Sequence, residues 1–139
     1  MSKVAVVYWS GTGNTEAMAD AVARGVTESG SEAVLLTAIS VNDLSSYDAI
    51  AFGCPAMGAE ELEDSEFEPM FSALEGSLNG KKIALFGSYG WGDGEWMRTW
   101  ENRCKEDGAV FACEYVICNE APDEDAVSAC KALGAALTK

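Results

Sequence analysis

The sequence predicts an α/β fold in which five parallel strands form the middle layer of a three-layer sandwich. Two observations lead to this fold class. Short, continuous apolar runs, typical of strands covered on both faces, recur along the 139 residues. Between them, the apolar residues follow the 3.6-residue period of amphipathic helices. Strands and helices that alternate in this way form a parallel sheet with helices on both faces, here within one domain over residues 1–139.

The predicted strands are short segments rich in Val, Ile, Ala and Phe. The connection between the second and third of them, around residues 41–46, is short, and the pattern does not determine its structure. A chain of 139 residues is long enough to bury a core. The five predicted strands are residues 4–9, 34–36, 49–53, 83–87 and 109–117.

The predicted helices are recognised by apolar residues three or four positions apart. The first lies after the first strand, and Gly30 follows it as a candidate C-cap because glycine adopts a left-handed conformation at little cost. The others follow the third, fourth and fifth strands. The apolar stripes are Met18, Val22 and Val26; Phe67, Met70, Phe71 and Leu74; Met97, Trp100 and Cys104; and Val127, Cys130, Leu133 and Leu137.

The charge balance excludes some functions. Nine basic and 23 acidic residues give a net charge of −14, and such a field repels the phosphates of nucleic acids. It steers the protein toward partners with a basic face, although solubility alone also explains it. No apolar run approaches the roughly 20 residues that span a bilayer, and the N-terminus does not resemble a signal peptide. We therefore expect no membrane insertion and a cytoplasmic location.

Cysteine and histidine contents exclude further classes. The five cysteines have no C-x-x-C spacing, so neither a disulfide framework nor a zinc site is predicted, and most are expected to be buried and reduced. The chain has no histidine. Serine–histidine and cysteine–histidine catalysis are therefore excluded, and no metal site is expected.

The residues that follow the first strand form a candidate phosphate site. Ligands of parallel sheets bind beyond the carboxyl ends of the strands. Glycines in such a turn let several N–H groups converge, and the following helix adds its dipole. There is no Walker A lysine and no G-x-G-x-x-G, so ATP hydrolysis and NAD binding are disfavoured; an ordinary capped turn is the alternative. The segment consists of Ser10, Gly11, Thr12, Gly13, Asn14 and Thr15.

Two further strand ends carry candidate ligands for a flat ring. Met57 follows the third strand, where its thioether could pack against an aromatic system, although core filling is the simpler explanation for it alone. Trp91 follows the fourth strand between glycines, a poor place to bury an indole. Presentation to a planar ligand explains it better than packing back onto its own domain.

Together, these segments resemble the short-chain flavodoxins of anaerobic bacteria. Residues 8–16 (YWSGTGNTE) resemble the phosphate loop of that family, and residues 53–58 (GCPAMG) and 85–94 (LFGSYGWGDG) resemble its two ring-flanking loops. Residues 66–69 and 119–120 also match in place. There is no room after the fifth strand for the insertion that long-chain flavodoxins carry. The resemblance implies a sheet of order 2-1-3-4-5 with noncovalent FMN at its carboxyl edge.

The resemblance also implies roles for individual residues. The hydroxyl and amide side chains of the first loop would hold the phosphate, Met57 and Trp91 would flank the isoalloxazine, and Glu60 would accept from flavin N3–H. Backbone groups of residues 88–91 would meet the pyrimidine edge. The predicted cofactor-binding residues are Ser10, Gly11, Thr12, Gly13, Asn14, Thr15, Pro55, Ala56, Met57, Gly58, Ala59, Glu60, Ser88, Tyr89, Gly90, Trp91, Gly92 and Asn119.

The implied function is a low-potential one-electron carrier that cycles between the semiquinone and hydroquinone of FMN. Its implied partners are oxidoreductases and reductases of the ferredoxin-dependent type with basic docking faces, and it would act as a monomer. In relatives, the carbonyl of the glycine at Gly58 turns toward flavin N5–H, a flip that glycine eases because positive φ costs it little. Two positions depart from many relatives. Pro55 replaces a phosphate-binding hydroxyl, and Ala59 replaces a polar residue.

Two alternatives have the same fold. An FMN-dependent oxidoreductase, such as a quinone reductase, needs space over the flavin for a second substrate, and Trp91 argues against that space. A receiver domain needs an acidic pair after the first strand and an aspartate after the third. The sequence has Ser10-Gly11 and Gly53-Cys54 there instead, so a receiver domain is excluded.

Overall fold

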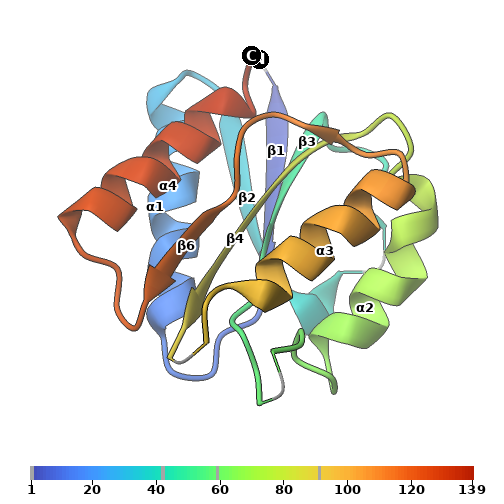
Figure 1. Ribbon diagram of the computed structural model, residues 1–139. Coiled ribbons are helices and arrows are strands. Elements are labelled where there is room, and N and C mark those ends of the chain that lie inside the picture. Colours follow the sequence, from blue (N-terminus) through green and yellow to red (C-terminus); the bar gives the residue numbers. More distant parts are fainter. Residues whose placement is uncertain (1, 42, 59, 91) are drawn as a thin grey trace.

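A six-stranded parallel sheet forms the middle layer of the molecule (Figure 1). The computed structural model describes residues 2–41, 43–58, 60–90 and 92–139. The strands run in the order β2-β1-β3-β4-β5. The sixth strand, β6, also pairs with β4, nearer its carboxyl end than β5 does. This order confirms the predicted 2-1-3-4-5 topology. The strands are β1 (Lys3–Tyr8), β2 (Glu32–Thr37), β3 (Ala49–Gly53), β4 (Lys82–Tyr89), β5 (Val110–Phe111) and β6 (Val116–Asn119).

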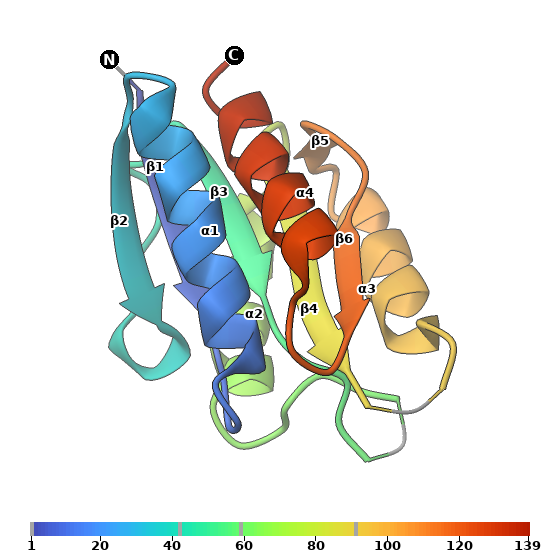
Figure 2. The same cartoon turned by 90° about the vertical axis from the view of Figure 1, so that its left-hand side faces the viewer.

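Helices cover both faces of the sheet. The first and last helices lie side by side on one face, and the two middle helices lie on the other (Figures 1 and 2). The N- and C-termini lie at the same end of the molecule, where the parallel strands begin (Figure 2). The helices are α1 (Asn14–Glu28), α2 (Phe67–Leu74), α3 (Glu95–Glu106) and α4 (Glu124–Ala136), with short 3-10 turns η1 (Ala38–Ser40) and η2 (Glu75–Ser77).

Alternation along each strand divides the core between the two faces. In β1, Val4 and Val6 pack with α1 and α4, whereas Ala5 and Val7 pack with α2 and α3. All four side chains are fully buried. Side chains of successive strand residues point to opposite faces, so a strand covered on both sides must be apolar throughout. This explains the continuous apolar runs in the sequence.

The predicted fifth strand is two short strands. Instead of one segment over residues 109–117, the structure has β5 and β6, which pair with the beginning and the end of β4. The six residues from Phe111 to Val116 lie opposite only four, from Ile83 to Phe86. The extra length cannot follow the straight ladder of β4, so residues 112–115 bend out of it.

A buried carboxylate begins α2 and anchors the loop before it. The Glu63 side chain accepts hydrogen bonds from the backbone N–H groups of Ser65, Glu66 and Phe67 at 2.7–2.8 Å. Its own N–H donates to Cys54 Sγ at 3.4 Å, directly after β3. Glu63 is only 4% exposed. Burial raises the pKa of its carboxyl, but the hydrogen bonds from Ser65, Phe67 and Glu66 outweigh burial, and the pKa lies below its ordinary value.

An arginine joins α3 to α2. The Arg103 guanidinium donates to Glu68 at 2.8 Å and to Glu75 at 2.7 and 2.9 Å. Hydrogen bonds from Arg103 hold the pKa of both glutamates below their ordinary value. Asp107, the C-cap of α3, lies beside this cluster, and its Oδ2 is buried with no partner among the described residues. Burial raises its pKa to about 6, and Glu75 adds to the rise.

Asp107 therefore makes stability depend on pH. The folded protein holds the Asp107 proton up to about pH 6, whereas the unfolded chain releases it near 3.8. The free energy of unfolding thus falls as the pH rises between these values and stays lower above them. We expect Asp107→Asn to raise the Tm by about 3 °C at pH 8 and to change it little at pH 4, close to the pKa of the unfolded chain. Thermal unfolding by circular dichroism at both pH values measures this.

Glu106→Gln removes the same charge one residue earlier, from an exposed side chain, and serves as the control. It should shift the Tm by similar small amounts at both pH values. If Asp107→Asn and wild type instead differ by the same Tm at pH 4 and pH 8, Asp107 does not titrate in this range.

Candidate functional site

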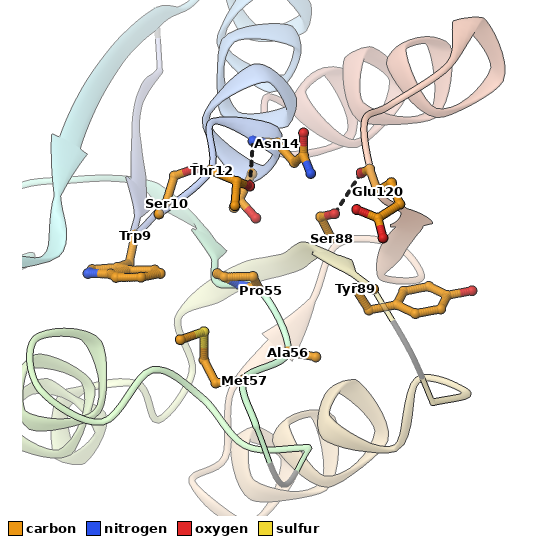
Figure 3. A pocket seen from close by; sticks show the side chains of 13 residues that line it. Trp9, Ser10, Thr12, Asn14, Pro55, Ala56, Met57, Ser88, Tyr89 and Glu120 are labelled. Carbon is orange, nitrogen blue, oxygen red and sulfur yellow. Dashed lines mark hydrogen bonds between the residues drawn. The ribbon is translucent and has the colours of Figure 1, made fainter.

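A cavity of about 230 Å³ opens at the carboxyl edge of the sheet, beyond the ends of β1, β3 and β4. Figure 3 shows Ser10, Thr12 and Asn14 above it, with Pro55 and Met57 facing them from the loop after β3. Glu120 carries the only charged side chain among the described residues that line the cavity. The lining residues are Trp9, Ser10, Gly11, Thr12, Asn14, Thr15, Pro55, Ala56, Met57, Ser88, Tyr89, Gly90 and Glu120.

The loop between β1 and α1 is organised by Ser10. Its Oγ accepts from the backbone N–H groups of Gly13 at 3.1 Å and Glu16 at 3.2 Å. Gly13 is the N-cap of α1 with φ of +96°, a left-handed conformation that favours glycine. The loop therefore turns directly into the helix, and the N-terminus of α1 points its dipole at the cavity.

Several donors in this loop have no partner among the described residues. The backbone N–H groups of Gly11, Thr12 and Thr15 donate no hydrogen bond there. Thr15 is 1% exposed, and its buried Oγ1 is likewise without a partner. Unpaired donors at a helix N-terminus fit a phosphate group. The residues present thus fit the phosphate end of FMN.

The loop after β3 brings a thioether to the cavity. Met57 pairs with Glu61 through two backbone hydrogen bonds of 2.9 and 3.2 Å, and Ala56 N–H donates to the carbonyl of Ser88 at 3.0 Å. The loop is therefore tied both to itself and to β4. Met57 is 37% exposed, which is unusual for a core methionine. Next to it, Gly58 does not have a left-handed φ, and a Cβ there would meet open space.

The Glu60 side chain does not line this cavity, and one oxygen of its carboxylate is bonded to α3. Its Oε2 accepts from Trp96 N–H, in the first turn of that helix, at 3.0 Å. Its Oε1 is buried and has no partner in the described part of the chain. The backbone of Glu60 is left-handed, with φ of +59°. An unpaired buried carboxylate oxygen beside the site fits a donor such as flavin N3–H.

The third side of the cavity comes from the end of β4 and the residue after β6. The Ser88 hydroxyl donates to the carbonyl of Glu120 at 2.7 Å (Figure 3), and Glu120 N–H donates to the carbonyl of Tyr89 at 2.8 Å. Asn119 Nδ2 also donates to that carbonyl, at 3.3 Å. These bonds hold Glu120 in a left-handed conformation with φ of +59° and its carboxyl group close to Gly90.

The structure gathers most, but not all, of the predicted site residues around one cavity. Gly13, Gly58 and Asn119 are next to lining residues in the sequence without lining the cavity themselves, and Glu60 and Gly92 do not line it either. Ala59 and Trp91 lie outside the described residues, so the expected stacking of Trp91 remains a prediction. Gly92 has a left-handed φ, and a Cβ there would overlap Glu60 Oε1.

Two lining residues were not predicted, Trp9 and Glu120. The sequence predicts Trp9 as the last residue of the first strand, but β1 ends at Tyr8, and the half-buried Trp9 side chain lines the edge of the cavity. Glu120 was noted only as part of a matching segment. A carboxylate next to an Asn at the end of a strand, at the predicted ligand edge, was the available signal for it.

Comparison with known proteins gives consistent matches. The family model described as flavodoxin matches residues 6–134. The flavodoxin of Megasphaera elsdenii is 50% identical over 138 residues, which cover 98% of each chain. That of Clostridium beijerinckii is 47% identical over 121 residues, covering 86% of this chain and 88% of that protein. The solution structure of two-electron reduced Megasphaera elsdenii flavodoxin has a TM-score of 0.89 at 49% identity, covering 96% of this chain and 97% of that one.

The chain belongs to the flavodoxin family. Membership confirms the resemblance in the sequence and, with it, the cofactor and the function: this flavodoxin binds FMN and carries electrons. Among the helices of the described residues, none is both long and apolar enough to span a membrane.

Proposed function

We propose that this flavodoxin transfers one electron at a time at low potential and has no substrate of its own. When bound, FMN supplies the redox chemistry, because its ring accepts and returns single electrons. The chain supplies the field around it. Glu120 is the only charged group among the described residues of the cavity lining, and Glu60 lies close by. Negative charges disfavour a further negative charge on a nearby group, which supports a low potential for the second electron.

We assign the roles in the site as follows. The N–H groups of Gly11, Thr12 and Thr15 and the Thr15 hydroxyl bind the phosphate, since they are the unpaired donors of the loop. Ser10 and Thr12 accept hydrogen bonds from backbone N–H groups of this loop. Together with Asn14, they also line the cavity. Met57 would pack against the inner face of the ring and Trp91 against the outer face. Glu60 Oε1 would accept from flavin N3–H, while Oε2 would stay bonded to α3.

The partners we propose are redox proteins with basic docking faces, of the ferredoxin-dependent oxidoreductase and reductase type. The net charge of −14 supports this partner class, because opposite charges steer association. We further propose that the protein acts as a monomer in the cytoplasm. The five cysteines are free, as expected in a reducing compartment.

Reconstitution of the apoprotein tests this function. We expect one FMN per chain and, with NAD(P)H and a quinone, turnover no faster than that of free FMN. An FMN-dependent oxidoreductase would instead show saturable turnover with both substrates. Saturable turnover would therefore contradict the carrier function and favour the alternative.

Gly58 provides a separate test of how the protein responds to the first electron. The open space around it allows a side chain without a clash, so Gly58→Val should leave FMN affinity within about threefold of wild type. A β-branched residue resists the left-handed conformations that a carbonyl flip can require. We expect a lower yield of one-electron-reduced flavin in a redox titration. An unchanged yield would show that the backbone freedom of glycine at position 58 does not affect the one-electron-reduced flavin.

A further inference from the structure

Trp9 forms the wall between the FMN cavity and a second cavity. Its half-buried side chain lines the first cavity (Figure 3). Gly11 lines the same cavity. Trp9 also lines a separate cavity of about 180 Å³ with Tyr8, Glu16 and Glu66. Among the described residues, Trp9 and Ser10 alone line both cavities. An indole between two cavities keeps its position only if contacts outside both cavities hold it.

Two such contacts anchor Trp9. Its backbone N–H donates to the carbonyl of Gly53 at 3.1 Å, which extends the pairing of β1 with β3 by one residue. Its side chain packs against the core between the sheet and α2–α3. Neither anchor belongs to the phosphate loop: Gly53 ends β3, and the core cluster is formed by the sheet, α2 and α3. The position of the indole is therefore set by the rigid part of the fold.

The far edge of the indole touches the phosphate loop at Gly11. A Cβ at Gly11 would lie 2.9 Å from Cη2 and 3.3 Å from Cζ3 of Trp9, closer than atoms in van der Waals contact. Gly11 is not in a left-handed conformation. The backbone conformation thus does not require glycine at this position, whereas the indole leaves no room for a side chain.

We infer that Trp9 is a positioning residue for the phosphate end of FMN. Its indole transmits the position of the sheet to the backbone of Gly11. Gly11 and the next residue, Thr12, carry N–H groups that are unpaired in the described part of the chain. The inference rests on the FMN site proposed above. It concerns the phosphate only, so riboflavin, which has the same ring and no phosphate, should be insensitive to changes at Trp9.

A double-mutant cycle tests the contact. Trp9→Phe keeps an aromatic side chain at the same anchor but removes Cζ3 and Cη2, the atoms that reach Gly11. We expect Gly11→Ala to weaken FMN binding about tenfold in the wild-type background and less than about twofold in the W9F background, as for residues in direct contact. Flavin fluorescence quenching on the apoprotein gives the dissociation constants for FMN and for riboflavin.

Gly76→Ala is the matched control, because a Cβ at this exposed glycine in η2 meets open space. It should leave both dissociation constants unchanged. Riboflavin affinity should stay within about threefold across the whole cycle.

Three results separate the possible failures. Equal losses from Gly11→Ala in both backgrounds would overturn the role of Trp9. Equal losses for FMN and riboflavin would also overturn it, because they would indicate general damage to the fold. Failure of the wild-type apoprotein to bind FMN would contradict the cofactor itself, and the inference with it.

Discussion

Ser10→Ala is expected to weaken FMN binding by about 100-fold and riboflavin binding by less than about threefold. The Ser10 hydroxyl oxygen accepts from the N–H groups of Gly13 and Glu16 and keeps its own O–H available for the phosphate. Alanine removes both bonds and leaves the turn into α1 without its internal support. Equilibrium titration of the apoprotein with each flavin measures the two affinities.

Ser77→Ala is the control for this substitution. The Ser77 hydroxyl also bonds to the backbone, donating to the carbonyl of Leu74 at 2.8 Å, but it lies in η2, away from the cavity. It should change neither affinity. If Ser10→Ala weakens both flavins equally, Ser10 supports the fold and not the phosphate site in particular.

Glu63→Ala is expected to lower the free energy of unfolding by about 3 kcal/mol. Three backbone N–H groups at the beginning of α2 would lose their shared acceptor, and Phe67 among them is fully buried. The effect depends on ionisation. Because the folded pKa lies below 4.5, this stabilisation is present above pH 4.5 and is lost as the pH falls through the lowered value. Urea unfolding at pH 7 measures the loss.

Asp64→Ala, at the next residue, removes an exposed carboxylate and should change the free energy of unfolding by less than about 0.5 kcal/mol. If Glu63→Ala also changes the free energy of unfolding by less than about 0.5 kcal/mol, water replaces the carboxylate as acceptor for the N–H groups at the start of α2.

The sheet could be predicted because burial on both faces leaves a local signal. The continuous apolar run of β3 was assigned with its observed bounds, and β4 was found but ends two residues later, at Tyr89. The division of the fifth strand could not be predicted. It depends on how many residues of β4 lie opposite it, which is a relation between two strands and not a property of either.

The site was predictable where the sequence itself carries the chemistry. The polar loop of residues 10–15 and Met57 are such cases. Donor side chains in a turn, and a methionine in a loop at the ligand edge, can be recognised in the sequence alone. The hydrogen bond between the Glu60 carboxylate and α3 could not be predicted, because its partner Trp96 is 36 residues away. Trp9 was missed for another reason: an apolar residue at the end of an apolar run gives no sign that its strand ends one residue earlier.

The visible spectrum of the FMN-loaded protein during stepwise reduction tests the central claim most directly. A one-electron carrier should pass through two separate steps, with long-wavelength absorption rising to a maximum near half-reduction and disappearing at full reduction. A single two-electron step with no such absorption would contradict the account, because it would indicate a protein that transfers electron pairs.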